Sequence, residues 1–142
     1  MSAKEYLQQF STLSIRIDEL TEELLNWRTK AEKITSSSEG LRVKGTPTQS
    51  RLEENVCKII DIEETISEKI SKMVNLRLEI ESILEEISVA EYQTILQLRY
   101  INLKKWESIA ERMNYSQQWV FILHSKALDE VEQIINKTVD CN

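Results

Sequence analysis

The stretch TSSSEGLRVKGTPTQS, residues 35–50, contains both glycines and the only proline of this 142-residue chain. Glycine and proline are the two residues that most strongly destabilise the interior of a helix. Because these helix breakers are confined to one window, long helices can form on both sides of it. The sequence therefore predicts an all-α protein with a loop over residues 35–50.

Upstream of the loop, apolar residues recur at alternating steps of four and three positions, which is the seam of a coiled coil. We expect a helix over residues 3–34, roughly 48 Å long at about 1.5 Å per residue. Its seam consists of Leu13, Ile17, Leu20, Leu24, Trp27, Ala31 and Ile34, and Leu7 and Phe10 extend it towards the first residue.

Downstream of the loop, a second seam predicts a helix over residues 51–87. Glu63 and Arg77 interrupt this seam, while Ile62, Leu76 and Ile83 widen it alongside. A single exposed helix this apolar would aggregate, so we expect the two helices to form a long antiparallel coiled-coil hairpin. Its remaining apolar surface predicts a homodimer through the coiled coil, with charged seam residues fixing the register. The second seam reads Leu52, Val56, Ile59, Glu63, Ile66, Ile70, Met73, Arg77, Ile80, Leu84 and Ile87.

Arg42, Lys44 and Arg51 make the loop locally basic. Two interpretations follow from its composition. The loop is a solvated connector, or it is an arm that contacts DNA phosphate or RNA polymerase.

The rest of the chain has the pattern of a small helix-turn-helix domain. The spacing of Ser88 and Glu91 is that of a capping box, so we expect a new helix to begin at Ser88. Helices over residues 106–113 and 117–136 follow, joined by a tight turn in which Asn114 takes a positive φ and Ser116 caps the last helix. Two helices joined by so short a turn, the first with the small Ala110 at its middle, indicate a helix-turn-helix. The apolar face of the last helix is Val120, Leu123, Ala127, Leu128, Val131, Ile134 and Ile135.

The pattern therefore divides the chain into a helical hairpin over residues 1–88 and a helix-turn-helix domain over residues 89–142. The net charge of −6 is unevenly spread between these parts. Residues 1–89 carry 12 Lys and Arg against 17 Asp and Glu, whereas residues 90–142 carry 6 against 7. Most of the acidity lies outside the second part, which leaves a DNA-binding face possible there.

Other classes of protein are disfavoured. No apolar run approaches the roughly 20 residues of a membrane span, and the first residues lack a signal-peptide core, so we expect a cytoplasmic protein without membrane contact. Cys57 and Cys141 are expected to be free thiols, and neither has a metal-type CxxC spacing. The only histidine, His124, suits a packed or surface role, and no glycine-rich phosphate loop is present. We therefore expect no metal, no cofactor and no catalytic activity.

Residues 96–128, LQLRYINLKKWESIAERMNYSQQWVFILHSKAL, resemble the fourth region of bacterial primary sigma factors, which reads the −35 promoter element. The matching features are LRY at the end of one helix, IAERM in the next, NYS as the turn and KAL at the close of the third. The whole chain, with its paired long helices and GTP loop, further resembles small phage-encoded proteins related to the ArpU and RinA late-transcription regulators. The resemblance implies a helix-turn-helix of sigma region-four type and a role in transcription.

The resemblance implies that the base-reading positions fall at Gln117, Gln118 and Ile122, with Trp119 beside them. At the positions of Gln117, Gln118 and Ile122, the sigma family usually has Arg, Glu and Gln. Glutamine can pair with adenine, and an aliphatic side chain can contact the thymine methyl. Ordinary polar surface is the other interpretation of the glutamines, and packing against an earlier helix is that of Trp119 and Phe121. Phosphate contacts would come from Lys104, Lys105, Arg112, Ser116 and Lys126.

We therefore expect a sequence-specific transcription regulator of phage or prophage origin that binds double-stranded DNA. The alternatives are a protein-interaction module that docks on RNA polymerase, and DNA recognition during packaging like that of a small terminase subunit.

Overall fold

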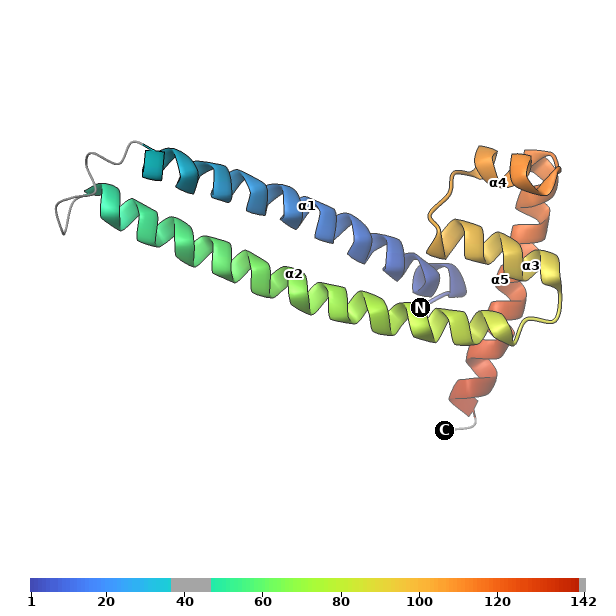
Figure 1. Ribbon diagram of the computed structural model, residues 1–142. Helices are drawn as coiled ribbons and strands as arrows, with labels where there is room; N and C mark the ends of the chain where they lie inside the picture. The colour runs from blue at the N-terminus through green and yellow to red at the C-terminus, as the bar shows by residue number, and fades with distance from the viewer. Residues whose placement is uncertain (37–46, 141–142) are drawn as a thin grey trace. The chain divides into compact units, whose positions relative to one another are not determined.

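The computed structural model describes residues 1–36 and 47–140, and within these ranges it contains helices and no strand (Figure 1). The prediction of an all-α protein is confirmed. The elements are α1 (Ala3–Ser36), α2 (Pro47–Glu85), α3 (Ala90–Leu96), a π-helical turn (Gln97–Ile101), α4 (Trp106–Met113) and α5 (Gln117–Asp140).

Both ends of the predicted loop belong to helices, and its residues 37–46 lie outside the described residues. Residues 35 and 36 belong to α1, and residues 47–50 belong to α2. Proline is compatible with the first position of a helix, because the amide hydrogen that it lacks has no intrahelical acceptor there. Pro47 therefore begins a helix that the sequence pattern started only at Arg51. Arg42 and Lys44, the other two basic residues of the predicted arm, lie outside the described residues.

The chain divides into two compact units, residues 14–72 and residues 1–13 with 73–142. In the first of these, the segments of α1 and α2 lie side by side (Figure 1). Leu20, Leu24 and Ile62 are buried between them, with Trp27, Ile59 and Ile66 packed alongside. The predicted seam of α1 is confirmed as its buried face, since all its members are buried or half-buried.

The predicted seam of α2 is wrong at four of its eleven positions. Val56, Glu63, Ile70 and Arg77 are exposed, and the residues one position earlier, Asn55, Ile62, Lys69 and Leu76, are buried or half-buried instead. Up to Ile80, the seam takes three-residue and four-residue steps in the opposite order from the one predicted, whereas Ile80, Leu84 and Ile87 are buried as predicted. Both charged residues assigned to it make ion pairs at the surface: Glu63 with Arg28 at 2.8 Å and Arg77 with Glu81 at 2.9 Å.

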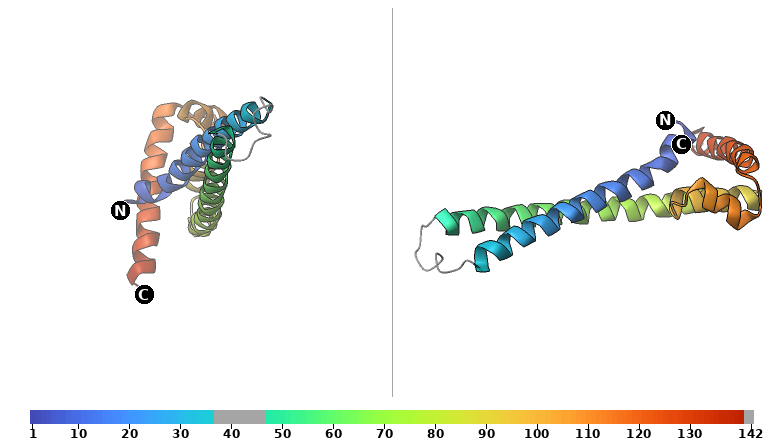
Figure 2. Two further views of the ribbon diagram at one scale, coloured as in Figure 1. Left: turned by 90° about the vertical axis from the view of Figure 1, so that its left-hand side faces the viewer. Right: turned by 90° about the horizontal axis from the view of Figure 1, so that it is seen from above.

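In the other unit, the first turns of α1 and the last turns of α2 pack against α3, the π-helical turn and α5 (Figure 2). The backbone amide of Ala3 donates a hydrogen bond to Glu132 Oε2 of α5 at 2.9 Å. The core consists of Ala3, Leu7, Phe10, Leu76, Ile80, Leu84, Ile87, Leu96, Tyr100, Ile101, Ala127 and Val131. The ends of the long helices are therefore in the same compact unit as α3–α5. The predicted domain boundary between residues 88 and 89, a statement about independent folding, stays a prediction.

The capping box predicted at Ser88 does not form. Helix α3 begins at Ala90, and no side chain caps its first turn. Ser88 instead donates hydrogen bonds from its backbone amide and its hydroxyl to Glu130 Oε1 of α5, at 2.8 and 2.9 Å. A carboxylate that accepts both bonds competes with the local cap, so the link between α2 and α3 is fixed by a residue distant in the sequence.

Candidate nucleic-acid interface

The turn between α4 and α5 has the conformation that the sequence predicts. Asn114 ends α4 in the left-handed region with φ 59°, and asparagine tolerates that region better than most residues. The amide of Asn114 donates to the carbonyl of Glu111, and that of Tyr115 donates to the carbonyl of Ala110, at 3.3 and 3.0 Å. These two bonds form the Schellman motif that closes a helix. Both predicted roles of this turn are confirmed, because Ser116 Oγ accepts a hydrogen bond from the amide of Trp119 at 3.1 Å and caps α5.

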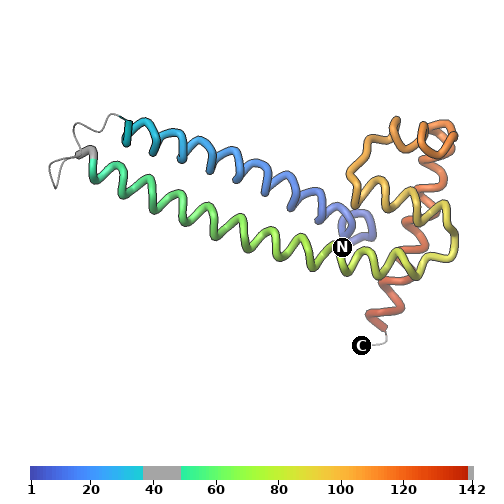
Figure 3. The backbone as a smooth tube through the Cα atoms, in the orientation of Figure 1, coloured from blue at the N-terminus to red at the C-terminus, as the bar shows by residue number. Residues whose placement is uncertain are grey.

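A small apolar cluster holds α3, α4 and α5 together; Figure 3 follows the backbone through them. Ile109 and Ala110 of α4 meet Val120 and Leu123 of α5 over Ile95 of α3, and all five are at most 6% exposed. The predicted apolar face of α5 is confirmed, since its members are buried or half-buried. This packing fixes which side of α5 faces away from the protein.

The base-reading candidates lie on the first turns of α5, outside this cluster. Gln117 and Gln118 are exposed, and the side chains of Trp119 and Ile122 are 42% and 46% exposed to solvent. Residues three and four positions apart share one side of a helix, so Gln118 and Ile122 present a common face. Phe121 is 45% exposed and meets Trp106 of α4 edge-on, with ring centroids 5.3 Å apart. The packing interpretation therefore fits Phe121 in part, and for Trp119 it stays an alternative.

The phosphate-contact candidates are spread over three places. Lys104 and Lys105 precede α4, Arg112 lies in its last turn, and Lys126 lies one turn beyond Ile122 on α5. Lys105, Arg112, Ser116 and Lys126 are exposed, whereas Lys104 is half-buried. Ser116 Oγ already accepts the capping bond, so its additional role as a phosphate donor stays a prediction.

His124, left as a packed or surface residue by the sequence, lies at the centre of a buried aromatic group. It is 9% exposed, its Nε2 is 2.7 Å from the hydroxyl oxygen of Tyr100, and its ring centroid is 4.6 Å from that of Trp106. Burial, followed by the charges of Lys4 and Arg99, lowers the pKa of His124 to about 4. The imidazole is therefore neutral at physiological pH and serves packing.

Sequence reasoning missed two residues beside this surface. Arg99 places its guanidinium carbon 4.4 Å from the centroid of the Trp106 ring and donates a hydrogen bond to the carbonyl of Lys104 at 3.0 Å. Leu103 is 41% exposed and has φ 55°, a conformation that is uncommon for a bulky residue. Arg99 falls inside LRY, which was interpreted only as the end of a helix. No signal in the sequence indicates the backbone conformation of Leu103.

No group of three or more His, Cys, Asp and Glu side chains within the described residues is placed to hold a metal ion. None of the described helices combines the length and the apolarity that crossing a bilayer requires. Cys57 is a free, exposed thiol, as predicted, and Cys141 lies outside the described residues.

Comparison with known proteins places the chain in a family. No curated protein and no solved structure matches it. A family model described as a protein of unknown function, DUF1492, matches residues 33–132, which include all of α2, α3 and α4 and the first turns of α5. Since this match covers more than half of the sequence, the chain belongs to the DUF1492 family.

Proposed function

We propose that this protein is a sequence-specific DNA-binding transcription regulator of phage or prophage origin, with a helix-turn-helix of sigma region-four type. The observation that carries the proposal is the exposed face of α5. Directly after a closed turn and a serine cap, that helix presents Gln118 and Ile122 together, away from the core. A glutamine amide beside an aliphatic group matches an adenine edge beside a thymine methyl, so the preferred site is A/T-rich.

The cations around this face support contact with the DNA backbone. Lys105 directly precedes α4, and Arg112 and Lys126 lie on α4 and α5; all three are exposed. Each phosphate that such a cation neutralises releases counterions and strengthens binding to any sequence. Three or four cations on one copy of the chain give weak DNA binding. A dimer would double the number of phosphate contacts and so strengthen the binding.

We expect the protein to form a homodimer, with the two long helices as an antiparallel coiled-coil hairpin that supplies the interface. Val56, Ile60 and Ile70 keep 42–49% of their surface exposed on α2, at spacings that place them on one side of the helix, where a second copy would cover them. Light scattering at micromolar concentration should return about twice the 16.6 kDa of the chain. A mass of one chain would contradict the dimer.

Selection from a random duplex library tests the DNA-binding proposal. A salt concentration of about 50 mM is used because a protein with few phosphate contacts binds too weakly to be selected at higher salt. An A/T-rich motif is expected. Gln118→Ala should weaken binding to that motif about tenfold, or roughly 1.4 kcal/mol, and relax the preference at one base position. Lys105→Ala should weaken binding to every sequence alike and lower the salt slope by about one unit.

Lys137→Ala is the matched control, because this lysine lies in the last turn of α5, far along the helix from Gln118. It should change neither the motif nor the salt slope. If no motif emerges from the selection, or if Gln118→Ala binds the motif like the unsubstituted protein, the DNA-reading proposal fails.

The second candidate is a protein-interaction module that docks on RNA polymerase. The exposure of Trp119, Phe121 and Ile122 favours it, since three large apolar side chains within four residues are an unusual cost on a solvent-facing helix. If the selection yields no motif while the protein co-purifies with RNA polymerase, this candidate replaces the first. Loss of co-purification on Trp119→Ala, but not on Gln118→Ala, would then identify the docking residues.

A further inference from the structure

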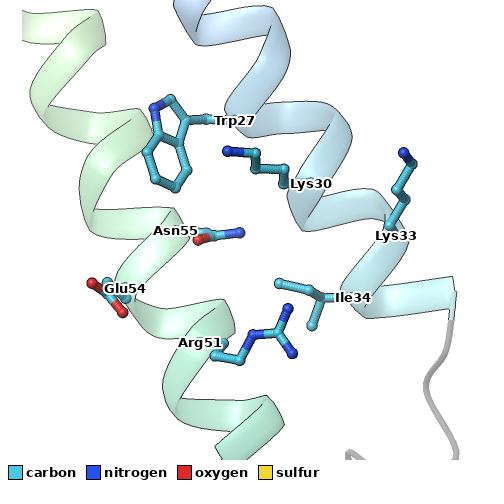
Figure 4. Close-up of a pocket in the computed structure, with 7 residues that line it drawn as sticks. All are labelled: Trp27, Lys30, Lys33, Ile34, Arg51, Glu54 and Asn55. Carbon is cyan, nitrogen blue, oxygen red and sulfur yellow. The ribbon is translucent and has the colours of Figure 1, made fainter.

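A polar cavity lies between α1 and α2 inside the unit of residues 14–72. Its volume is about 550 Å³, which falls within the range of roughly 300–1,000 Å³ typical of sites for small molecules. Three cations and one carboxylate line it, although the chain as a whole carries a net charge of −6. The lining residues are Trp27, Lys30, Lys33, Ile34, Arg51, Glu54 and Asn55 (Figure 4).

Three of the side chains that extend into the gap between the two helices carry hydrogen-bond donors, and Trp27 and Ile34 extend into it beside them (Figure 4). Figure 4 shows Lys30 pointing inward from α1, with Arg51 and Asn55 pointing inward from α2. Lys33 and Glu54 point away from the gap. The centre of the cavity therefore combines an ammonium, a guanidinium and an amide, and the one carboxylate of its lining is turned outward.

Lys30 is held in position by the aromatic ring beside it. Its Nζ lies 4.5 Å from the centroid of the Trp27 ring, which is the geometry of a cation–π contact. A charge that is already held loses less side-chain entropy when it binds a ligand, so the ammonium is preorganised for an anion.

Asn55 provides a second, independent indication of a ligand. It occupies a position of the α2 seam where an apolar residue would pack best, it is 9% exposed, and it makes no hydrogen bond to another described residue. Its amide opens onto the cavity (Figure 4) and is not sealed within the protein. The hydrogen-bonding capacity of this nearly buried amide therefore depends on what the cavity contains.

We propose that this cavity binds a small organic phosphate, whose phosphate group is held by Lys30, Arg51 and Asn55. A phosphate offers several acceptor oxygens in a compact dianion. Arginine matches it with a bidentate fork, lysine with a point charge, and the amide with one further donor. The cavity is larger than a phosphate group, and Ile34 provides an apolar wall for the organic part. This site lies in the other compact unit from the α5 face, so it does not depend on the DNA-binding proposal.

Nuclear magnetic resonance of the indole N–H groups in the full chain tests the proposal. The chain has three tryptophans, and Trp27→Phe identifies the signal of Trp27. Inorganic phosphate, adenosine monophosphate and a DNA duplex are added separately at constant ionic strength. Both small phosphates should shift the Trp27 signal saturably and leave the signals of Trp106 and Trp119 in place.

Arg51→Gln should weaken this response at least fivefold, while Lys72→Gln, which removes an exposed cation of the same helix outside the cavity, should leave it unchanged. Asn55→Leu should also abolish the response, yet it should raise the thermal stability of the free protein, because an apolar residue replaces a nearly buried amide. That combination separates loss of the site from loss of the fold. A Trp27 signal that neither small phosphate moves, or that responds equally in Arg51→Gln, would overturn the proposal. A signal that only the duplex moves would overturn the assignment to a small ligand.

Discussion

Leu123→Ala is expected to lower the free energy of unfolding by about 3 kcal/mol, while Ile122→Ala, one position earlier, should change it by less than about 0.5 kcal/mol. Leu123 is 5% exposed within the cluster that holds α3, α4 and α5 together, so truncating it leaves a cavity in that cluster. Ile122 is 46% exposed and has little packing to lose. Urea-induced unfolding followed by circular dichroism measures both changes.

The same pair of variants should behave in the opposite way when DNA binding is measured. At a temperature where both remain folded, Ile122→Ala should weaken binding to the selected motif, because it removes the proposed contact with a thymine methyl. Leu123→Ala should bind with nearly unchanged affinity. Fluorescence anisotropy with a labelled duplex provides the measurement. If Ile122→Ala destabilised the protein as much as Leu123→Ala, the exposed face of α5 would be covered by another part of the protein in solution.

Acidification from pH 7.5 to pH 5 is expected to destabilise the protein by about 1–2 kcal/mol through His124 alone. In the folded chain the pKa of this histidine is lowered to about 4, while in the unfolded chain it keeps its ordinary value of 6.5. Between these two pKa values, His124 is protonated in the unfolded state and neutral in the folded state. The stabilisation is fully present above pH 6.5 and is lost progressively as the pH falls towards 4.

The assignment of this pH dependence is direct, because His124 is the only histidine of the chain. His124→Gln, which stays neutral throughout the range, should have a lower stability at pH 7.5 but a much flatter dependence on pH. Urea unfolding at half-unit pH intervals gives the slope for both proteins. A slope between pH 7 and 5.5 that is the same in His124→Gln would assign the dependence to carboxylates and contradict a buried neutral histidine.

The parts of the fold that the sequence predicted well depend on local pattern. The confinement of Gly40, Gly45 and Pro47 to one window predicted the all-helical chain, and Asn114 and Ser116 predicted the turn between α4 and α5. In each case the backbone conformation is determined by the residue itself and its neighbours in the sequence. Residues within a few positions of each other therefore contained the information that was needed.

The parts that failed depend on contacts between distant residues. The seam of α2 was assigned by choosing apolar residues where they were available, which selected Val56 and Ile70 over Asn55 and Lys69. Only the position of α1 decides which side of α2 is buried. Ser88 was likewise assigned to a local cap, whereas Glu130, 42 positions away, accepts both its hydrogen bonds. Neither competition can be evaluated from hydrophobic spacing alone.

For the candidate sites too, features set by local sequence pattern were predicted and features set by contacts between distant residues were not. The exposed face of α5 was predicted because a helical wheel separates Gln118 and Ile122 from Val120 without tertiary information. The cavity beside Trp27 was not predicted, because it requires Lys30 of α1 and Arg51 of α2 to lie opposite each other. The sequence indicated only that Arg51 belongs to a basic segment.

The π-helical turn between α3 and α4 bears on how the length of this chain can change during evolution. Its amide–carbonyl bond from Asn102 to Gln97, at 3.0 Å, spans five residues, where an α-helix spans four. Such a turn accommodates one extra residue and leaves the direction of the helix nearly unchanged. A deletion of one residue within 97–101 could therefore close to a regular helix, whereas a deletion within α4 or early α5 would rotate every later side chain by about 100° and turn the exposed face into the core. Among family members, gains and losses of single residues should accumulate at this turn and be absent from α4 and the first turns of α5.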